Sequence, residues 1–157
     1  NPATFADFRP ISLCTFVNKV FTRVLANRLR AVLPGLISPE QSAFCPGRDI
    51  AENVLLAQEM IASINKKARG HNCIFKLDMM KAFDRVSWEF LQRLLQKFGF
   101  EYRFILLILN NLSQSWFSVM VNGRARHFFQ ATRGIKQGDP LSPPSFSFSP
   151  LKPLVGV

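Results

Sequence analysis

Two stretches of this sequence contain residues whose types and spacing could support chemistry. Residues 76–88 read KLDMMKAFDRVSW and include two aspartates, Asp78 and Asp84. Residues 133–143 read RGIKQGDPLSP, in which two glycines permit a close backbone approach beside a lysine, a glutamine and an Asp-Pro turn. An aspartate carboxylate can bind a divalent cation, and the second stretch is suited to hold a phosphate group or a base pair.

The surroundings of the two aspartates differ. Asp78 ends the apolar run CIFKLD, residues 73–78, which predicts one short buried strand. Ligand groups collect at the carboxyl ends of strands in open α/β sheets, and a carboxylate buried there needs hydrogen bonds or a cation such as Mg²⁺. Spacing alone favours a solvated strand end over a metal ligand. Asp84 is better interpreted as a helix cap, and Phe83 beside it as core filler or, less readily, the wall of a ligand pocket.

The elements that must position these stretches follow from apolar periodicity and capping residues. Apolar residues recur at helical spacing in four segments, of which Pro34 should end the first, while Asp49 and Ser87 can cap the second and third. Asn122-Gly123 between two strand-like runs is a strong hairpin signal. The expected elements are helices over residues 17–33, 50–64, 88–98 and 102–112 and a hairpin over residues 115–130. The fold class is therefore α/β in the broad sense (α+β).

Composition indicates one folded, basic domain. The chain has 157 residues, of which 48% are hydrophobic, and a formal net charge of +10. Such a charge attracts polyanions, so nucleic acid or an anionic membrane surface is the expected class of partner. The basic residues are dispersed along the chain, which favours a folded basic surface over a disordered basic tail.

The sequence also indicates a compartment. No apolar run is long enough to span a bilayer and no leader opens the chain, so we expect no membrane partner and an intracellular protein, in the nucleus or cytoplasm. Cys14, Cys45 and Cys73 form no Cys-x-x-Cys pair, which favours reduced thiols without a disulfide-linked partner over a zinc site. Because the first residue is Asn1 and not a methionine, we expect an excerpt of a longer chain.

Five motifs occur in one order along the chain and carry a resemblance to a known family. They are FRPISL (8–13), NKVFTRVLANRL (18–29), ISPEQSAFCPGRD (37–49), KLDMMKAFDRVSW (76–88) and RGIKQGDPLSP (133–143). This series resembles the reverse transcriptases of non-LTR retrotransposons (LINE-type transposable elements), particularly the plant kind. The resemblance covers residues 1 to about 143.

The resemblance implies an RNA-directed DNA polymerase, a nucleotidyltransferase, with an incomplete right-hand fold of helical fingers and a partial palm sheet that includes the hairpin near residues 116–130. Residues 1–72 would form a fingers-like region, residues 73–142 a partial palm, and residues 143–157 a divergent and disordered tail. In the complete enzyme two Mg²⁺ ions would activate the 3′ oxygen of the primer and steady the triphosphate of the incoming dNTP. The implied partners are an RNA template, a DNA primer and a dNTP.

The resemblance also assigns roles to residues within 76–88 and 133–143. Asp78 matches the first metal-binding aspartate, the catalytic carboxylate, and Met79 would add a backbone carbonyl to the metal. Phe83 matches the bulky aromatic residue that excludes a ribose 2′-OH. Gln137 and Gly138 match the motif that contacts the incoming nucleotide and the template.

Basic positions outside these stretches match as well. Lys19 and Arg23 match positions in the fingers that can reach the triphosphate. Arg9 and Arg48 lie in family motifs and would support contacts to the template or the nucleotide, as nucleic-acid-binding residues.

The chain departs from the family after the last motif. The palm of the family needs a later hairpin with an aromatic-Ala-Asp-Asp motif, whereas the last acidic residue here is Asp139. One carboxylate holds two divalent ions poorly, because their mutual repulsion requires several negative ligands. We therefore expect a fragment that is inactive alone and whose Mg²⁺ binding is weak or absent.

Two other functions stay open for the isolated chain. It could be a non-catalytic remnant that binds RNA or an RNA–DNA hybrid, or a pseudogene product without function. The family continues into a helix after the last motif, whereas this sequence has prolines there: Pro143, Pro144, Pro150 and Pro153. A shifted reading frame or a truncated gene copy explains this difference. We expect poor order after about Leu141.

Overall fold

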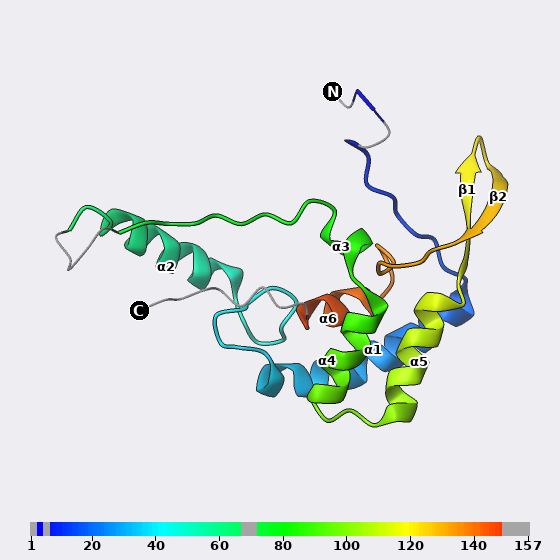
Figure 1. The fold of residues 1–157 in the computed structure, drawn as a ribbon, viewed down its shortest axis with the longest axis horizontal. Helices are drawn as coiled ribbons and strands as arrows, with labels where there is room; N and C mark the ends of the chain where they lie inside the picture. The colour runs from blue at the N-terminus through cyan, green and yellow to red at the C-terminus, as the bar shows by residue number, and fades with distance from the viewer. Residues whose placement is uncertain (1–2, 5–6, 67–71, 149–157) are drawn as a thin grey trace.

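The computed structural model describes residues 3–4, 7–66 and 72–148. Its elements are, in chain order, α1 (Phe16–Leu36), α2 (Ile50–Ala62), α3 (Ala82–Arg85), α4 (Trp88–Lys97), α5 (Tyr102–Ser113), β1 (Trp116–Val121), β2 (Arg124–Gln130) and α6 (Ser142–Ser147). Figure 1 shows α1, α4, α5 and α6 gathered in one cluster, from which α2 and the hairpin project toward opposite ends of the molecule. The described chain is thus a mixed α+β structure, as the sequence predicted.

The hydrophobic core lies inside this helical cluster. α1, α4 and α5 each contribute a stripe of residues spaced three or four apart, which is the spacing that places side chains on one face of a helix. The buried apolar residues of the three helices are Leu25, Leu29, Leu33, Leu91, Leu95, Ile105, Ile108 and Leu112. Ile135, Leu141 and Phe148 from the C-terminal part complete the same core. The core therefore joins the helices to the segment that contains the second chemical stretch.

Helix α1 is longer than predicted. It begins after Thr15, whose side chain accepts a hydrogen bond from the backbone N–H of Asn18, and it continues through Pro34 to Leu36. Proline in the final turn removes a single helical hydrogen bond, so the predicted stop at Pro34 is wrong. The apolar residues near the start of the helix, among them Val17, are exposed.

The predicted caps of α2 and α4 are confirmed. The Asp49 carboxylate accepts a hydrogen bond from the N–H of Ala51, and the Ser87 hydroxyl accepts one from the N–H of Phe90. The predicted capping role of Asp84 is wrong, because this residue lies inside α3 and the helix that follows is capped by Ser87. Helix α2 itself has no buried residue, so its apolar side chains face solvent.

The predicted strand over residues 73–78 is wrong. Residues 72–79 contain no helix or strand, and their apolar side chains are exposed, with Phe75 at 82% and Leu77 at 73% exposure. A strand needs a hydrogen-bonded neighbour. In the part of the chain that the structure describes, β1 and β2 form a two-stranded sheet and no strand lies beside this segment. The predicted partial palm sheet is therefore reduced to the hairpin.

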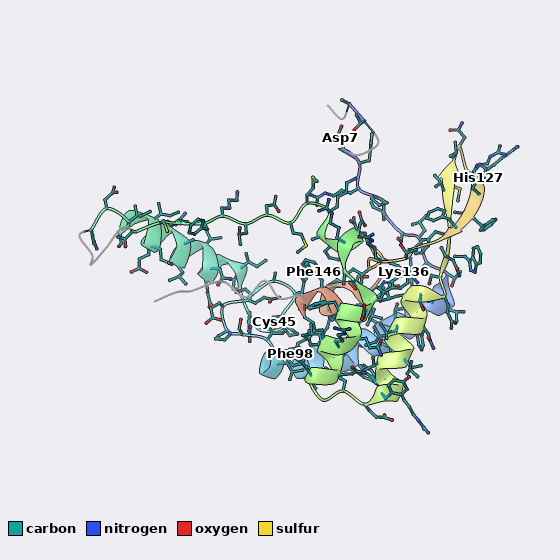
Figure 2. All side chains as sticks on the ribbon, in the orientation of Figure 1. Asp7, Cys45, Phe98, His127, Lys136 and Phe146 are labelled. Atoms are coloured by element: carbon teal, nitrogen blue, oxygen red, sulfur yellow. The ribbon has the colours of Figure 1, made fainter. Side chains whose placement is uncertain are left out.

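The predicted hairpin is confirmed. β1 and β2 pair antiparallel, and Phe117 lies opposite Phe129. Asn122 and Gly123 have φ angles of 49° and 75°, which are the positive values that a tight two-residue hairpin turn requires. The register shifts between Phe117 and Val119, so the ladder contains a bulge. His127, which Figure 2 labels on the hairpin, has a positive φ.

The expected disorder after Leu141 is wrong for residues 142–148. These residues form α6 and the turn that follows it, with Pro143 and Pro144 in the first turn, where a missing N–H costs the helix nothing. Phe148 is buried, and its ring centroid lies 5.4 Å from that of Phe98. Residues 149–157 of the predicted tail lie outside the described residues.

Two further findings concern predicted absences. Within residues 3–4, 7–66 and 72–148, no helix has the length and apolarity needed to cross a bilayer. Cys14, Cys45 and Cys73 are all free thiols.

The turn between α1 and α2 depends on the Arg48 side chain. Its guanidinium donates hydrogen bonds to the carbonyl oxygens of Ser38, Gln41 at 2.7 Å, Pro34 at 3.1 Å and Ile37 at 3.0 Å. Pro34 belongs to the last turn of α1, where carbonyl groups lack helical partners and attract a positive charge. Arg48 therefore holds this turn against the end of the helix.

We expect Arg48→Met to lower the free energy of unfolding by about 2–3 kcal/mol, because carbonyl groups would lose charged donors. Chemical denaturation followed by far-UV circular dichroism measures this change. Arg103→Met is the matched control, because the Arg103 side chain is 90% exposed. Equal stability losses in the two variants would contradict the structural role of Arg48.

Candidate functional site

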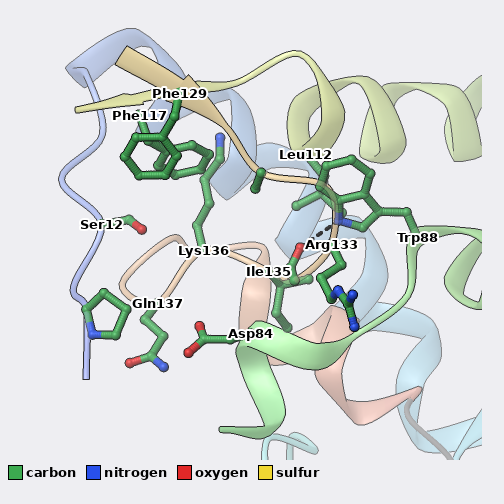
Figure 3. Close-up of a pocket in the computed structure, with 13 residues that line it drawn as sticks. Ser12, Asp84, Trp88, Leu112, Phe117, Phe129, Arg133, Ile135, Lys136 and Gln137 are labelled. Atoms are coloured by element: carbon green, nitrogen blue, oxygen red, sulfur yellow. Dashed lines mark hydrogen bonds between the residues drawn. The ribbon is translucent and has the colours of Figure 1, made fainter. Parts of the chain in front are cut away.

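The loop that follows the hairpin lies against the segment that joins α3 to α4. The N–H groups of Gly134 and Ile135 donate hydrogen bonds of 2.8 Å to the carbonyl oxygens of Val86 and Phe83. In return, the Trp88 indole Nε1 donates to the carbonyl oxygen of Gly134 at 2.6 Å (Figure 3). The two chemical stretches of the sequence, which are far apart along the chain, therefore meet in one place.

Both glycines of this loop stand where a side chain would be crowded and the backbone strained. Gly134 has a φ of +90°, and a Cβ added there would lie 3.0 Å from the backbone oxygen of Asp84. Gly138 has a φ of +94°, and its Cβ would lie 3.3 Å from the carbonyl oxygen of Ser12. L-residues with a side chain rarely adopt these φ values. The glycines thus allow the loop to touch two other segments through backbone atoms.

A buried carboxylate completes the anchoring of the loop. Asp139 is only 3% exposed, and its Oδ2 accepts hydrogen bonds from Cys14 Sγ at 3.6 Å and Asn18 Nδ2 at 3.3 Å. Its Oδ1 accepts a bond from the N–H of Leu141 at 2.8 Å. Burial raises the pKa of the Cys14 thiol, and the negative charge of Asp139 raises it further, so the thiol stays protonated and can donate.

A cavity of about 430 Å³ opens beside this loop, and we call it the arginine pocket. Its walls come from the N-terminal segment, α1, α3, the loop and the start of α6. The residues that line it are Arg9, Arg23, Arg30, Phe83, Gln137, Gly138, Asp139, Pro140, Ser142 and Pro143. Five of the residues singled out from the sequence therefore share one cavity: Arg9, Arg23, Phe83, Gln137 and Gly138.

Sequence reasoning missed Arg30 as a site residue. It lies two helical turns after Arg23 on α1, and residues with this spacing project from the same side of a helix. That spacing was the signal that could have identified it.

The arginine pocket is electropositive. Arg9, Arg23 and Arg30 contribute three positively charged guanidinium groups, while the one acid in the wall, Asp139, already accepts three hydrogen bonds. Ion pairs within the described part of the chain involve other residues, on α4 and at the start of α5. Guanidinium groups without a carboxylate partner are suited to bind phosphate oxygens through paired N–H donors.

Aromatic packing holds the Phe83 ring at the edge of this pocket. The ring stacks on Phe146 of α6, with centroids 4.6 Å apart and planes 12° apart. It also meets Phe44 edge to face at 6.4 Å. Phe83 therefore fills part of the core and forms part of the pocket wall at the same time.

Four predicted site residues lie outside the arginine pocket. Asp78 and Met79 belong to the exposed segment before α3, Lys19 is exposed on α1, and Arg48 holds the turn after α1. None of the four lines the arginine pocket. Their proposed roles stay predictions.

The described residues do not by themselves fit a site for two Mg²⁺ ions. A magnesium site needs several oxygen ligands around each ion. Across the described ranges, no three side chains of His, Cys, Asp or Glu come together, and Asp78 presents a single exposed carboxylate.

Comparison with known proteins relates the sequence to one family. The sequence profile described as "Reverse transcriptase (RNA-dependent DNA polymerase)" matches residues 3–149. A Nasonia vitripennis protein named "Retrovirus-related Pol polyprotein from type-1 retrotransposable element R2" is 35% identical over 90% of this chain. A Drosophila melanogaster polyprotein from the type-2 element R2DM is 32% identical over 90% of the chain. The relatives are thus polyproteins of non-LTR retrotransposons, and the plant affiliation stays a prediction.

The chain spans a small part of these relatives. It covers 14% of the Nasonia protein and 13% of the Drosophila protein. It also covers 11% of the Xenopus laevis "Transposon TX1 uncharacterized 149 kDa protein", to which it is 31% identical over 91% of its own length.

We expect Gly134→Ala to destabilise the fold more than Gly99→Ala, by about 1 kcal/mol or more. Both positions have a positive φ, but a Cβ at Gly99 meets open space whereas one at Gly134 meets the backbone of Asp84. The difference therefore isolates the close approach from the backbone strain, and thermal or chemical unfolding of the two variants measures it. Equal destabilisation would mean that the loop does not contact Asp84.

Proposed function

The chain belongs to the reverse transcriptase (RNA-dependent DNA polymerase) family, and on this premise we propose that its arginine pocket binds the triphosphate of an incoming dNTP. In the complete protein, a DNA primer would be paired with an RNA template, and the 3′-OH of the primer would attack the α-phosphorus of the dNTP. One phosphodiester bond would form, the bond to the β-phosphate would break, and pyrophosphate would leave.

One observation carries this proposal: three arginines converge on the pocket that also contains Phe83 and Gln137. A triphosphate has several negative charges, and each guanidinium can donate two parallel hydrogen bonds to its oxygens. As the bond to the leaving pyrophosphate breaks, negative charge grows on these oxygens. Fixed positive groups would stabilise that charge without having to reorganise.

The rest of the pocket suits a sugar and a base. The Phe83 ring is held by Phe146 and Phe44, so it cannot turn aside easily, and a ring beside the 2′ carbon would exclude a hydroxyl group there. Gln137 offers an amide, and Gly138 lets the backbone approach the ligand. These features support a preference for deoxynucleotides.

Magnesium, which the family implies, has no step in this account. The described donor set does not fit two ions, because Asp78 is its one carboxylate in the predicted position and no second acid lies with it among the described residues. We retain Asp78 and Met79 as predicted ligands within a larger site of the complete protein.

A second candidate function is binding of RNA or an RNA–DNA hybrid without chemistry. It is favoured by the net charge of +10, which comes from 20 Lys and Arg against 10 Asp and Glu. Affinity for a polyanion would then arise from the dispersed basic surface, including Lys19, and would fall steeply as salt rises.

We expect Arg23→Met and Arg30→Met each to weaken dNTP binding by about tenfold or more, because each removes charged donors to the triphosphate. Isothermal titration with a dNTP and with the matching dNMP measures this change, and the loss should be larger for the triphosphate. Arg93→Met is the matched control, because the Arg93 side chain is 74% exposed on α4. An unchanged triphosphate affinity in both pocket variants would refute the proposal.

We expect the 157-residue chain to give no measurable extension of a DNA primer on an RNA template with dNTPs and Mg²⁺, because one carboxylate holds two divalent ions poorly. Gel analysis of a labelled primer tests this, and a hybrid-binding assay on the same preparation checks that the protein engages its substrate. Robust extension that disappears in Asp78→Ala would show that the chain is catalytically sufficient.

A further inference from the structure

A second cavity lies on the other side of the loop, between the hairpin, the N-terminal segment and α4, and we call it the aromatic cavity. Its volume is about 250 Å³. The residues that line it are Pro10, Ser12, Asp84, Trp88, Leu112, Phe117, Phe129, Ala131, Arg133, Gly134, Ile135, Lys136 and Gln137 (Figure 3). Of the residues with a proposed catalytic or binding role, Gln137 alone also lines this cavity.

Aromatic rings form much of its wall. Phe117 and Phe129, which face each other across the hairpin, stack with centroids 5.9 Å apart and planes 25° apart. Trp88 faces the cavity while its indole N–H is already bonded to the carbonyl oxygen of Gly134. Rings fixed in this way offer flat surfaces on which another ring can stack.

The side chain of a lysine lines the same cavity. Lys136 is only 8% exposed, and within the described residues its ammonium has no hydrogen-bond acceptor and no carboxylate within 4.0 Å. Figure 3 shows its side chain rising from the loop toward the two phenylalanine rings. An ammonium without a carboxylate partner can attract an anion that enters the cavity.

The other charged groups of the wall leave an excess of positive charge. Arg133 adds one positive charge and Asp84 one negative charge, so with Lys136 the formal sum is +1. Gln137 lines both this cavity and the arginine pocket. A ligand in the aromatic cavity would therefore lie next to a ligand in the arginine pocket, because Gln137 contributes to both walls.

We propose that the aromatic cavity binds one unpaired nucleotide of a single-stranded nucleic acid, with its base against the rings of Trp88, Phe117 and Phe129 and its phosphate on Lys136. A base has a flat face for stacking and is joined to a phosphate, which matches the two features of the wall. The volume lies just below the range of about 300–1,000 Å³ for drug-sized ligands, so it suits one base. This inference rests on the proposed function, which brings a template strand to this loop.

Tryptophan fluorescence tests the inference directly. The chain has two tryptophans, so Trp116→Phe leaves Trp88 as the single reporter, inside the cavity. In this background we expect an oligouridylate of about eight nucleotides to quench Trp88, and Lys136→Met to weaken that binding about tenfold. Lys136→Arg should retain most of the affinity. Lys97→Met, which removes an exposed lysine on α4, should change it little.

Each alternative result has a defined meaning. Oligouridylate binding without quenching of Trp88, or equal affinity in Lys136→Met and Lys97→Met, would overturn the inference. If free UMP binds as tightly as the oligonucleotide, per nucleotide, the ligand of the cavity is a small aromatic anion and not a strand. That result would also overturn the inference. If Lys136→Met fails to fold, Phe129→Leu serves instead and should reduce the quenching.

The failure of the proposed function is recognised separately. Arg23→Met should impair triphosphate binding and leave the Trp88 signal with oligouridylate unchanged. If Lys136→Met leaves oligouridylate binding unchanged while Arg23→Met still weakens triphosphate binding, this inference is contradicted and the proposed function is not. An absence of triphosphate binding in the unmodified chain would sink the proposed function.

Discussion

The buried carboxylate of Asp139 is the interaction on which the rest of the site depends. A charge inside the protein requires donors, and Asp139 draws them from the segment before α1, from α1 itself and from the turn that leads into α6. It thereby attaches the loop after the hairpin to the first helix of the chain. The raised pKa of Cys14 keeps one of these donors protonated.

This attachment gives the loop two working faces. One face contributes Gln137 and Gly138 to the arginine pocket, and the other contributes Lys136 to the aromatic cavity. Backbone hydrogen bonds from Gly134 and Ile135 hold the loop to the segment between α3 and α4. The conformation of one short loop therefore sets the distance between the two cavities, and glycine is required where that loop touches other backbone.

Charge is distributed in keeping with this arrangement. The arginines of the pocket come from the N-terminal segment and from α1. Asp139, the acid in the same wall, accepts its hydrogen bonds from neutral donors. By contrast, Asp78 lies on a segment that forms no helix or strand, and the apolar side chains around it are exposed. The nucleotide-facing half of the proposed site is assembled within the described chain, whereas the predicted metal-binding half is represented by a single carboxylate.

The sequence by itself determined the features that depend on near neighbours. The family resemblance of its motifs singled out Arg23 and Gln137, both of which line the arginine pocket. Near neighbours by themselves specified three features: the Asn122-Gly123 turn specified the hairpin, and Asp49 and Ser87 specified two helix starts. Each of these follows from local backbone preferences or from side-chain chemistry, which the sequence states directly.

Only the tertiary structure decided the features that depend on distant partners. The apolar run at residues 73–78 forms no strand because no strand lies beside it in the described chain, and α6 forms because Phe146 and Phe148 pack against side chains far away in the sequence. Contacts with distant segments likewise place Arg30 in the wall of the pocket and the Arg48 guanidinium at the end of α1. Burial and pairing are properties of contacts between segments, and local sequence patterns do not specify which segments meet.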